Sequence, residues 1–195
     1  MDFGEFIGGV GTVDLLIVLY FIGFFVLGFA QGTIRRLLGI LSILFSFLLA
    51  ATLAGPISEF LGANWRQFTP EYSYMVGFGT IFVASAVAFA LVIQGFYKPQ
   101  PLFQKARFAD EILGGILGLI QAALILGIVV VILDSFFLIP GIPADPDELP
   151  FLRDIWTALD SSQIVAVFRE SLIPFFFLLT GLFIPDRVEA MYPSA

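Results

Sequence analysis

The chain has 195 residues, of which 59% are hydrophobic and only 13% charged, and its mean hydropathy is +1.00. A soluble domain carries about twice that share of charged residues, so the composition indicates a membrane protein. The net charge of −7 argues against a nucleic-acid binder, and the absence of Cys and His excludes disulfides, thiol chemistry, Cys- or His-based metal sites and a Ser-His-Asp triad.

The N-terminus reads MDFGEFIGGVGTVD and contains three acidic residues but no Lys or Arg. A cleaved signal peptide begins with a basic region. We therefore interpret the first apolar run as a retained membrane-spanning helix.

Four apolar stretches are long enough to cross a bilayer, which takes about 20 residues. They are residues 15–34, 37–58, 72–97 and 112–133. The sequence thus predicts an all-α integral membrane protein, with four transmembrane helices in two hairpins within residues 1–140.

Basic residues in the short loops predict the orientation of these helices, because cytoplasmic loops carry an excess of Lys and Arg. The second loop contains only Arg66. We expect the first and third loops to be cytoplasmic and both termini to be extracytoplasmic. The predicted topology anchors are Arg35, Arg36, Lys98, Lys105 and Arg107.

Aromatic side chains beside the spans fit the two interfacial belts of a membrane protein. Trp65, Tyr72 and Tyr74 are expected in the outer belt, and Tyr97 in the inner belt.

Residues 141–195 form a tail of different character. A linker with several prolines precedes an amphipathic stretch, 151–172, which Asp160-Ser161-Ser162 divides into two helical pieces. We expect these helices to lie on the outer surface. The apolar segment 172–185 contains Pro174 and is too short to span comfortably, so an interfacial or re-entrant position is favoured while a fifth span stays open.

Small residues recur at four-residue spacing in three of the predicted spans. Such spacing lines one helix face with small side chains and lets two backbones approach closely in lipid. The pattern predicts tight packing, either within the bundle or between copies of the chain. The clearest examples are Gly28 and Gly32 in the first span and Gly114 and Gly118 in the fourth.

Polar residues are few in and beside the spans. Asp14, Asp110, Glu111 and Asp134 stand at helix ends, where Asp110 fits an N-cap position. Gln94 and Gln121 lie within spans, where they either bond across helices or line a small polar pathway. No acidic pair is expected at the bilayer centre, so we predict neither catalytic residues nor a metal or cofactor site.

Two motifs carry a resemblance to a known family. Gly28, Gly32 and Arg35 fit G-x-x-x-G-x-x-R after the first span, and Asp110, Gly114 and Gly118 fit D-x-x-L-G-x-x-x-G at the start of the last. Together with the order of the spans, over about residues 13–140, they resemble the colicin V production protein family. The family often has Arg directly after the Asp, where this chain has Glu111.

The resemblance implies a bacterial inner-membrane protein linked to production or export of a peptide toxin and to envelope homeostasis. We expect a non-enzymatic accessory or scaffold that has the lipid bilayer, further copies of itself or a membrane or periplasmic protein as partners, and no nucleic acid. The alternative is a small oligomeric transporter or channel.

Overall fold

A computed structural model of the chain describes residues 11–64, 68–97, 106–138 and 148–180. Every element in these ranges is a helix. Four helices are long and apolar enough to cross a membrane, as predicted. They are α2 (Thr12–Gln31), α3 (Thr33–Asn64), α4 (Pro70–Phe96) and α5 (Arg107–Phe137).

The helices differ from the predicted spans mainly in their ends. α3 continues six residues past the predicted end at residue 58, with Pro56 inside it, and α5 begins five residues earlier than predicted. α2 and α3 are separated by Gly32 alone, whose φ of 76° reverses the chain. A residue with a Cβ rarely adopts this φ, which explains why the turn occurs at a glycine.

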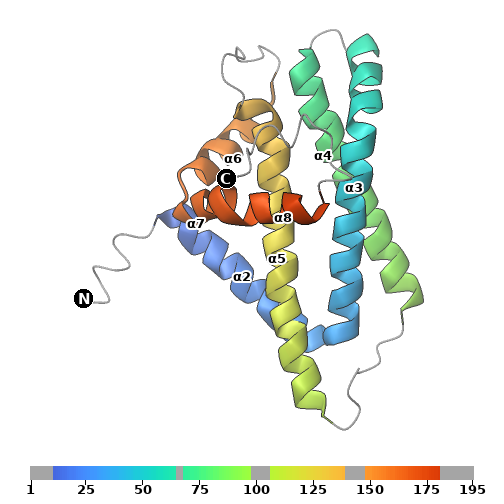
Figure 1. Cartoon of the computed structure of the whole chain (residues 1–195), viewed down its shortest axis with the longest axis vertical. Coiled ribbons are helices and arrows are strands. Elements are labelled where there is room, and N and C mark those ends of the chain that lie inside the picture. The colour runs from blue at the N-terminus through green and yellow to red at the C-terminus, as the bar shows by residue number, and fades with distance from the viewer. Residues whose placement is uncertain (1–10, 65–67, 98–105, 139–147, 181–195) are drawn as a thin grey trace.

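The packing follows the order of the chain only in part. α2 packs along α5, and α3 packs along α4, whereas α2 and α3 diverge from their shared turn and make few contacts. Figure 1 shows α3, α4 and α5 running along the long axis, with α2 slanting away from the lower end of α3. The consecutive helices α3 and α4 are therefore close partners, whereas α2 leaves its neighbour in the sequence, α3, and packs on the distant α5.

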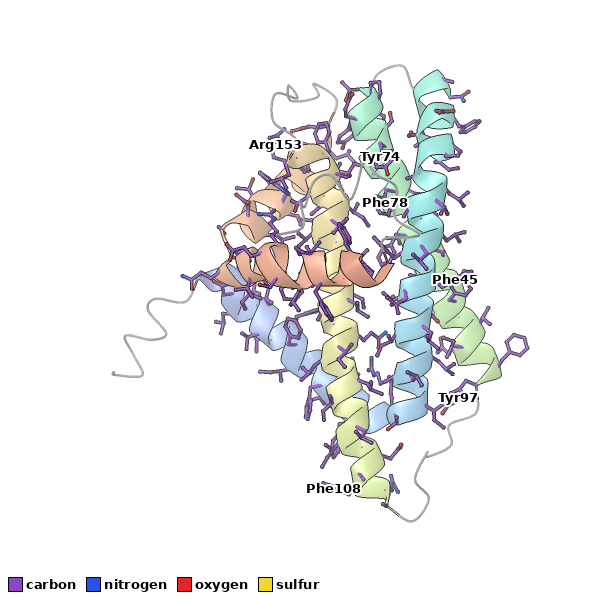
Figure 2. All side chains as sticks on the ribbon, in the orientation of Figure 1. Phe45, Tyr74, Phe78, Tyr97, Phe108 and Arg153 are labelled. Carbon is purple, nitrogen blue, oxygen red and sulfur yellow. The ribbon has the colours of Figure 1, made fainter. Side chains whose placement is uncertain are left out.

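Large apolar side chains cover the outside of the bundle, as a lipid-facing surface requires. Leu16 is 61% exposed, Val83 58% and Leu91 62%. The side chains of Phe45 and Phe108, labelled in Figure 2, are also exposed. Such exposure is unfavourable in water but not in a hydrocarbon environment.

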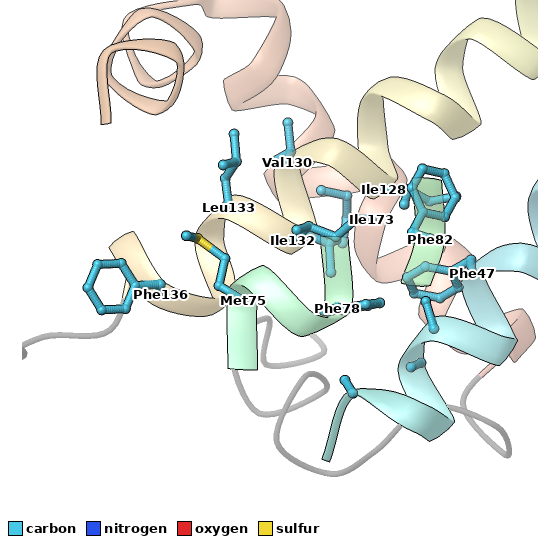
Figure 3. Close-up of a cluster of buried hydrophobic side chains, with 14 of the residues drawn as sticks. Phe47, Met75, Phe78, Phe82, Ile128, Val130, Ile132, Leu133, Phe136 and Ile173 are labelled. Carbon is cyan, nitrogen blue, oxygen red and sulfur yellow. The ribbon is translucent and has the colours of Figure 1, made fainter. Parts of the chain in front are cut away.

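The hydrophobic core lies where α3, α4 and α5 meet, toward the end away from the Gly32 turn, and is drawn in Figure 3. The rings of Phe47 and Phe78 are 5.8 Å apart, and those of Tyr72 and Phe136 are 5.1 Å apart. Tyr72 and Tyr74 are 0% and 5% exposed, so the predicted place in an interfacial belt is wrong for both. Trp65 lies outside the described residues.

The tail consists of α6 (Pro150–Asp160), α7 (Gln163–Val167), the π-helical turn η1 (Phe168–Leu172) and α8 (Ile173–Thr180). The break between α6 and α7 falls at the predicted serines, and Ser162 caps α7. The last three elements form a rod that crosses α5 (Figure 1). The described part of 172–185 belongs to this rod; residues 181–185 lie outside the described ranges.

Candidate functional site

The two glycine motifs face each other where α2 crosses α5. A Cβ atom built on Gly28 would lie 2.2 Å from the carbonyl oxygen of Gly114, and one on Gly118 would lie 2.3 Å from the carbonyl oxygen of Phe24. Both distances are far shorter than a van der Waals contact. Only glycine permits this backbone-to-backbone approach, so the crossing explains the spacing of both motifs.

The turn at Gly32 rests on the first turn of α5. A Cβ built on Gly32 would lie 2.6 Å from Oδ2 of Asp110, and Oγ1 of Thr33 donates a hydrogen bond of 3.0 Å to the carbonyl oxygen of Asp110. Asp110 is buried and inside α5, and the N-cap residue is Ala106. The N-cap prediction for Asp110 is therefore wrong, because α5 starts four residues before this position could cap it.

The two adjacent arginines lie in the first turn of α3 and have different environments. Arg35 is partly exposed, whereas Arg36 is only 5% exposed. The Nη1 atom of Arg36 donates a 2.8 Å hydrogen bond to Oε1 of Gln121 on α5, and its guanidinium lies 5.7 Å from the ring centre of Phe24. The sequence analysis predicts that both arginines lie in a loop, whereas the structure places both in α3 and buries Arg36 inside the bundle.

Gln121 approaches α3 closely at Gly39. A Cβ atom on Gly39 would lie 2.9 Å from Nε2 of Gln121, so the missing side chain makes room for the amide. Gln94, the other polar residue predicted within a span, is exposed near the C-terminal end of α4 and does not belong to this buried site.

The remaining predicted anchors lie near the start of α5. Arg107 is exposed and forms a 3.0 Å ion pair with Glu111, one helical turn away. Lys98 and Lys105 lie outside the described residues. The Gly32 turn and the start of α5 share one end of the bundle, hereafter the basic end (Figure 1).

At the opposite end, Asp134 joins α5 to the tail. Its side chain is fully buried and accepts hydrogen bonds from Arg169 Nε at 2.9 Å and Arg169 Nη2 at 2.7 Å. The indole Nε1 of Trp156 donates a third at 2.9 Å. Arg169 also pairs with Asp160. The Asp134–Arg169 ion pair is therefore largely buried, and both carboxylate oxygens of Asp134 accept hydrogen bonds.

Asp14 also joins the bundle to the tail, because it connects the start of α2 to the start of α7. It is 5% exposed, and its carboxylate accepts a 2.5 Å hydrogen bond from Ser162 Oγ and a 3.1 Å bond from the amide of Ile164. A residue at the start of α2 therefore caps a helix that begins almost 150 positions later. The sequence indicates only that Asp14 and Asp134 end apolar spans, and gives no sign of their partners.

Two grooves flank α5 beneath the tail. One, of about 400 Å³, lies between α5 and the η1–α8 part of the rod, and the other, of about 550 Å³, lies between α2 and α5. Phe168 lines both, and every lining residue is apolar. Neither groove is therefore built to carry a polar solute.

Chemically, this arrangement holds helices and the tail together. Within the described ranges, no three acidic side chains are grouped so that they could hold a metal ion. Three of the four buried charged residues are carboxylates; the fourth is Arg36, the only buried cation in the described part of the chain.

The comparison with known proteins finds the same family that the two motifs resemble, over a longer part of the chain. A model of the colicin V production protein family matches residues 13–174, which include α3, α4, α5, α6, α7, η1 and all but the first residue of α2. Searches of curated proteins and of solved structures gave no match. The family pattern thus includes most of the described tail as well as the bundle.

Proposed function

The chain belongs to the colicin V production protein family, and from this premise we propose that it is a non-enzymatic accessory or scaffold protein of the bacterial inner membrane. Its process would be toxin production or secretion, or maintenance of the envelope. The four apolar helices support a multi-pass position in the membrane.

We propose that the basic end faces the cytoplasm and that the tail lies on the extracytoplasmic side. Arg35 and Arg107 both lie at the basic end, and the sequence adds Lys98 and Lys105 to the loop before α5. Basic residues next to spans are retained on the cytoplasmic side of the membrane.

The observation that carries the scaffold role is the surface of α6. The inner side of this helix is fixed, since Trp156 bonds to Asp134 and stacks on Phe137. Its outer side exposes Phe151 (54%) and Ile155 (44%), one helical turn apart. A rigid helix with paired apolar side chains on its free face resembles the surfaces that dock onto protein grooves.

The test is purification of the full chain from native membranes in a mild detergent, followed by mass measurement of the intact complex. The accessory role predicts a second protein in fixed ratio, which is lost when Phe151 and Ile155 are both changed to Ser. A matched control is Val83→Ser with Val87→Ser, which changes an apolar pair on α4 that is at least as exposed and is also one helical turn apart. Loss of the second protein in both double variants would contradict the role of α6.

The alternative function is a small oligomeric transporter or channel. It is favoured by the contact between the buried Arg36 and the partly buried Gln121, which lie on two of the long apolar helices, because polar groups on such helices commonly mark a pathway. A homo-oligomer without a second protein would support it. Flux of ions and small peptides would then be measured in vesicles, with Asp110→Asn and Gln121→Leu as the first variants.

A further inference from the structure

Arg36 is a buried cation whose one hydrogen-bonded side-chain partner is neutral. Nη1 is bonded to the amide oxygen of Gln121, while Nε is enclosed by protein and has no acceptor. The face of Phe24 supplies only a weak attraction at 5.7 Å. An arginine side chain stays protonated in proteins, so its charge cannot be removed by titration.

The ion pairs of the described chain show how unusual this is. Arg107, Arg153 and Arg169 are all more exposed than Arg36, yet each contacts at least one carboxylate. None of these ion pairs includes Arg36. Burial of a charge without a counter-charge is strongly unfavourable. A site of this kind within a membrane span points to a ligand that brings the missing charge.

We propose that Arg36 and Gln121 form a binding site for an oxyanion of the phosphate class. A guanidinium presents parallel N–H groups that match two oxygens of a phosphate, and Nε is a free member of such a pair. The amide nitrogen of Gln121 is a further donor beside it. The anion thus supplies both the acceptor and the charge that Arg36 lacks.

The position along α3 favours phosphate among the oxyanions. Arg36 is the fourth residue of α3, so its Cα lies roughly 5 Å from the start of this helix. Where a spanning helix begins, the surrounding lipid headgroups carry phosphate. Arg35 at the same end adds positive charge beside the site, whereas the charge of Arg107 is balanced by Glu111.

The site is closed in this structure, because Nε is fully enclosed. Opening requires the flexible Arg36 stem to move far enough to admit an anion between its guanidinium and the Gln121 amide. The bond from Nη1 to Oε1 of Gln121 keeps the site closed until an anion replaces that oxygen as the acceptor. The phosphate belongs either to a lipid headgroup or to a small soluble anion.

The experiment uses the full chain, delipidated in an uncharged detergent, and follows its Tm. Inorganic phosphate is titrated against chloride at equal ionic strength, and phosphatidylglycerol is titrated against diacylglycerol, which lacks the phosphate. We expect one of the two phosphate probes to raise the Tm of the wild-type protein. Response to phosphatidylglycerol alone identifies a lipid headgroup, and response to inorganic phosphate identifies a soluble ligand.

Variants link that response to the site. Arg36→Gln should raise the apparent Kd for the probe that stabilises the wild type by about tenfold or more, as expected for loss of a charge-assisted hydrogen-bonded pair. The control Arg35→Gln removes the neighbouring, partly exposed arginine and should change the apparent Kd by less than about threefold. If Arg36→Gln does not fold, Arg36→Lys replaces it and should also weaken binding, because it keeps the charge but loses the fork.

Three results would overturn the proposal: neither phosphate probe raises the wild-type Tm, Arg35→Gln weakens binding as much as Arg36→Gln, or Arg36→Lys binds as well as the wild type. The proposal does not depend on the accessory role, since it is measured on the isolated protein without any protein partner.

Discussion

At the scale of single residues, residues of the same type differ in how closely they are packed and how far they are buried. Gly28 and Gly114 touch through their backbones, whereas Gly23 on α2 has open space beside it. Asp134 is fully buried beneath Arg169, whereas Asp160, which pairs with the same arginine, is 46% exposed. These contrasts provide matched controls for the next two predictions.

Gly114→Ala should destabilise the bundle, because its Cβ would lie 2.4 Å from the carbonyl oxygen of Gly28 and 2.9 Å from Gly32 Cα. Backbone atoms cannot give way without parting α2 from α5. We expect a loss of about 1–3 kcal/mol, seen as a lower Tm in detergent. Gly23→Ala should not lower the Tm, and an equal loss in both variants would refute the close-crossing argument.

Asp134→Asn should lower the free energy of unfolding by about 3 kcal/mol, because it removes one charge of a buried ion pair. Asp160→Asn should lower it by at most about 1 kcal/mol, since that carboxylate is largely exposed to solvent. Denaturation of the detergent-solubilised variants compares the two. Similar losses would mean that the Asp134 pair contributes no more than a surface ion pair.

At the scale of elements, the tail rod owes its place to capping and packing together. Ser162 caps α7 through a 3.2 Å bond from the amide of Val165, while its own hydroxyl donates to Asp14. Pro174 has no amide hydrogen, and the π-helical turn ends two residues before it, at Leu172. Phe168, from this turn, is buried against the bundle.

Ser162→Ala should loosen the rod from α2, at a cost of about 1 kcal/mol for the lost cap. The direct readout is faster limited proteolysis between α6 and α7 in the intact protein. Combining it with Asp14→Asn should cost less than the sum of both single changes, because the two residues share one hydrogen bond. Ser171→Ala, at an exposed position in η1, is the control and should leave the cleavage rate unchanged.

At the scale of the whole molecule, helix lengths relate the bundle to the bilayer. The 20 residues of α2 span roughly 30 Å, which equals the usual thickness of the hydrocarbon core. Because Asp14 near one end of α2 holds Ser162, the tail meets the bundle about one hydrocarbon thickness from the Gly32 turn. The longer α3 and α5, of 32 and 31 residues, extend past this thickness.

Labelling of introduced cysteines tests the proposed orientation, since the chain has no native Cys. Ser171→Cys in the tail should react with a membrane-impermeant maleimide applied to spheroplasts. Ala106→Cys at the exposed start of α5 should react only after the membrane is permeabilised. The reverse pattern would mean that the basic end faces outward and would invert the proposed topology.

The sequence by itself determined the class, the four long helices and the glycine motifs. Each of these depends on local patterns: twenty apolar residues suffice for a span, and small residues four apart share a helix face. The tail break at Ser161 and Ser162 was also predictable, because an N-cap serine bonds to the first turn of its own helix, which is a local interaction.

Only the tertiary structure decided which helices pack and which charges meet. α2 lies against α5 rather than α3, so the motifs around Gly28 and Gly114 touch across more than eighty residues. Two adjacent arginines look alike in the sequence, yet the helix phase turns Arg36 toward Gln121 and leaves Arg35 partly exposed. The partners of Asp134 are also set by packing, because contacts between distant segments depend on how the helices cross, and no local pattern encodes this.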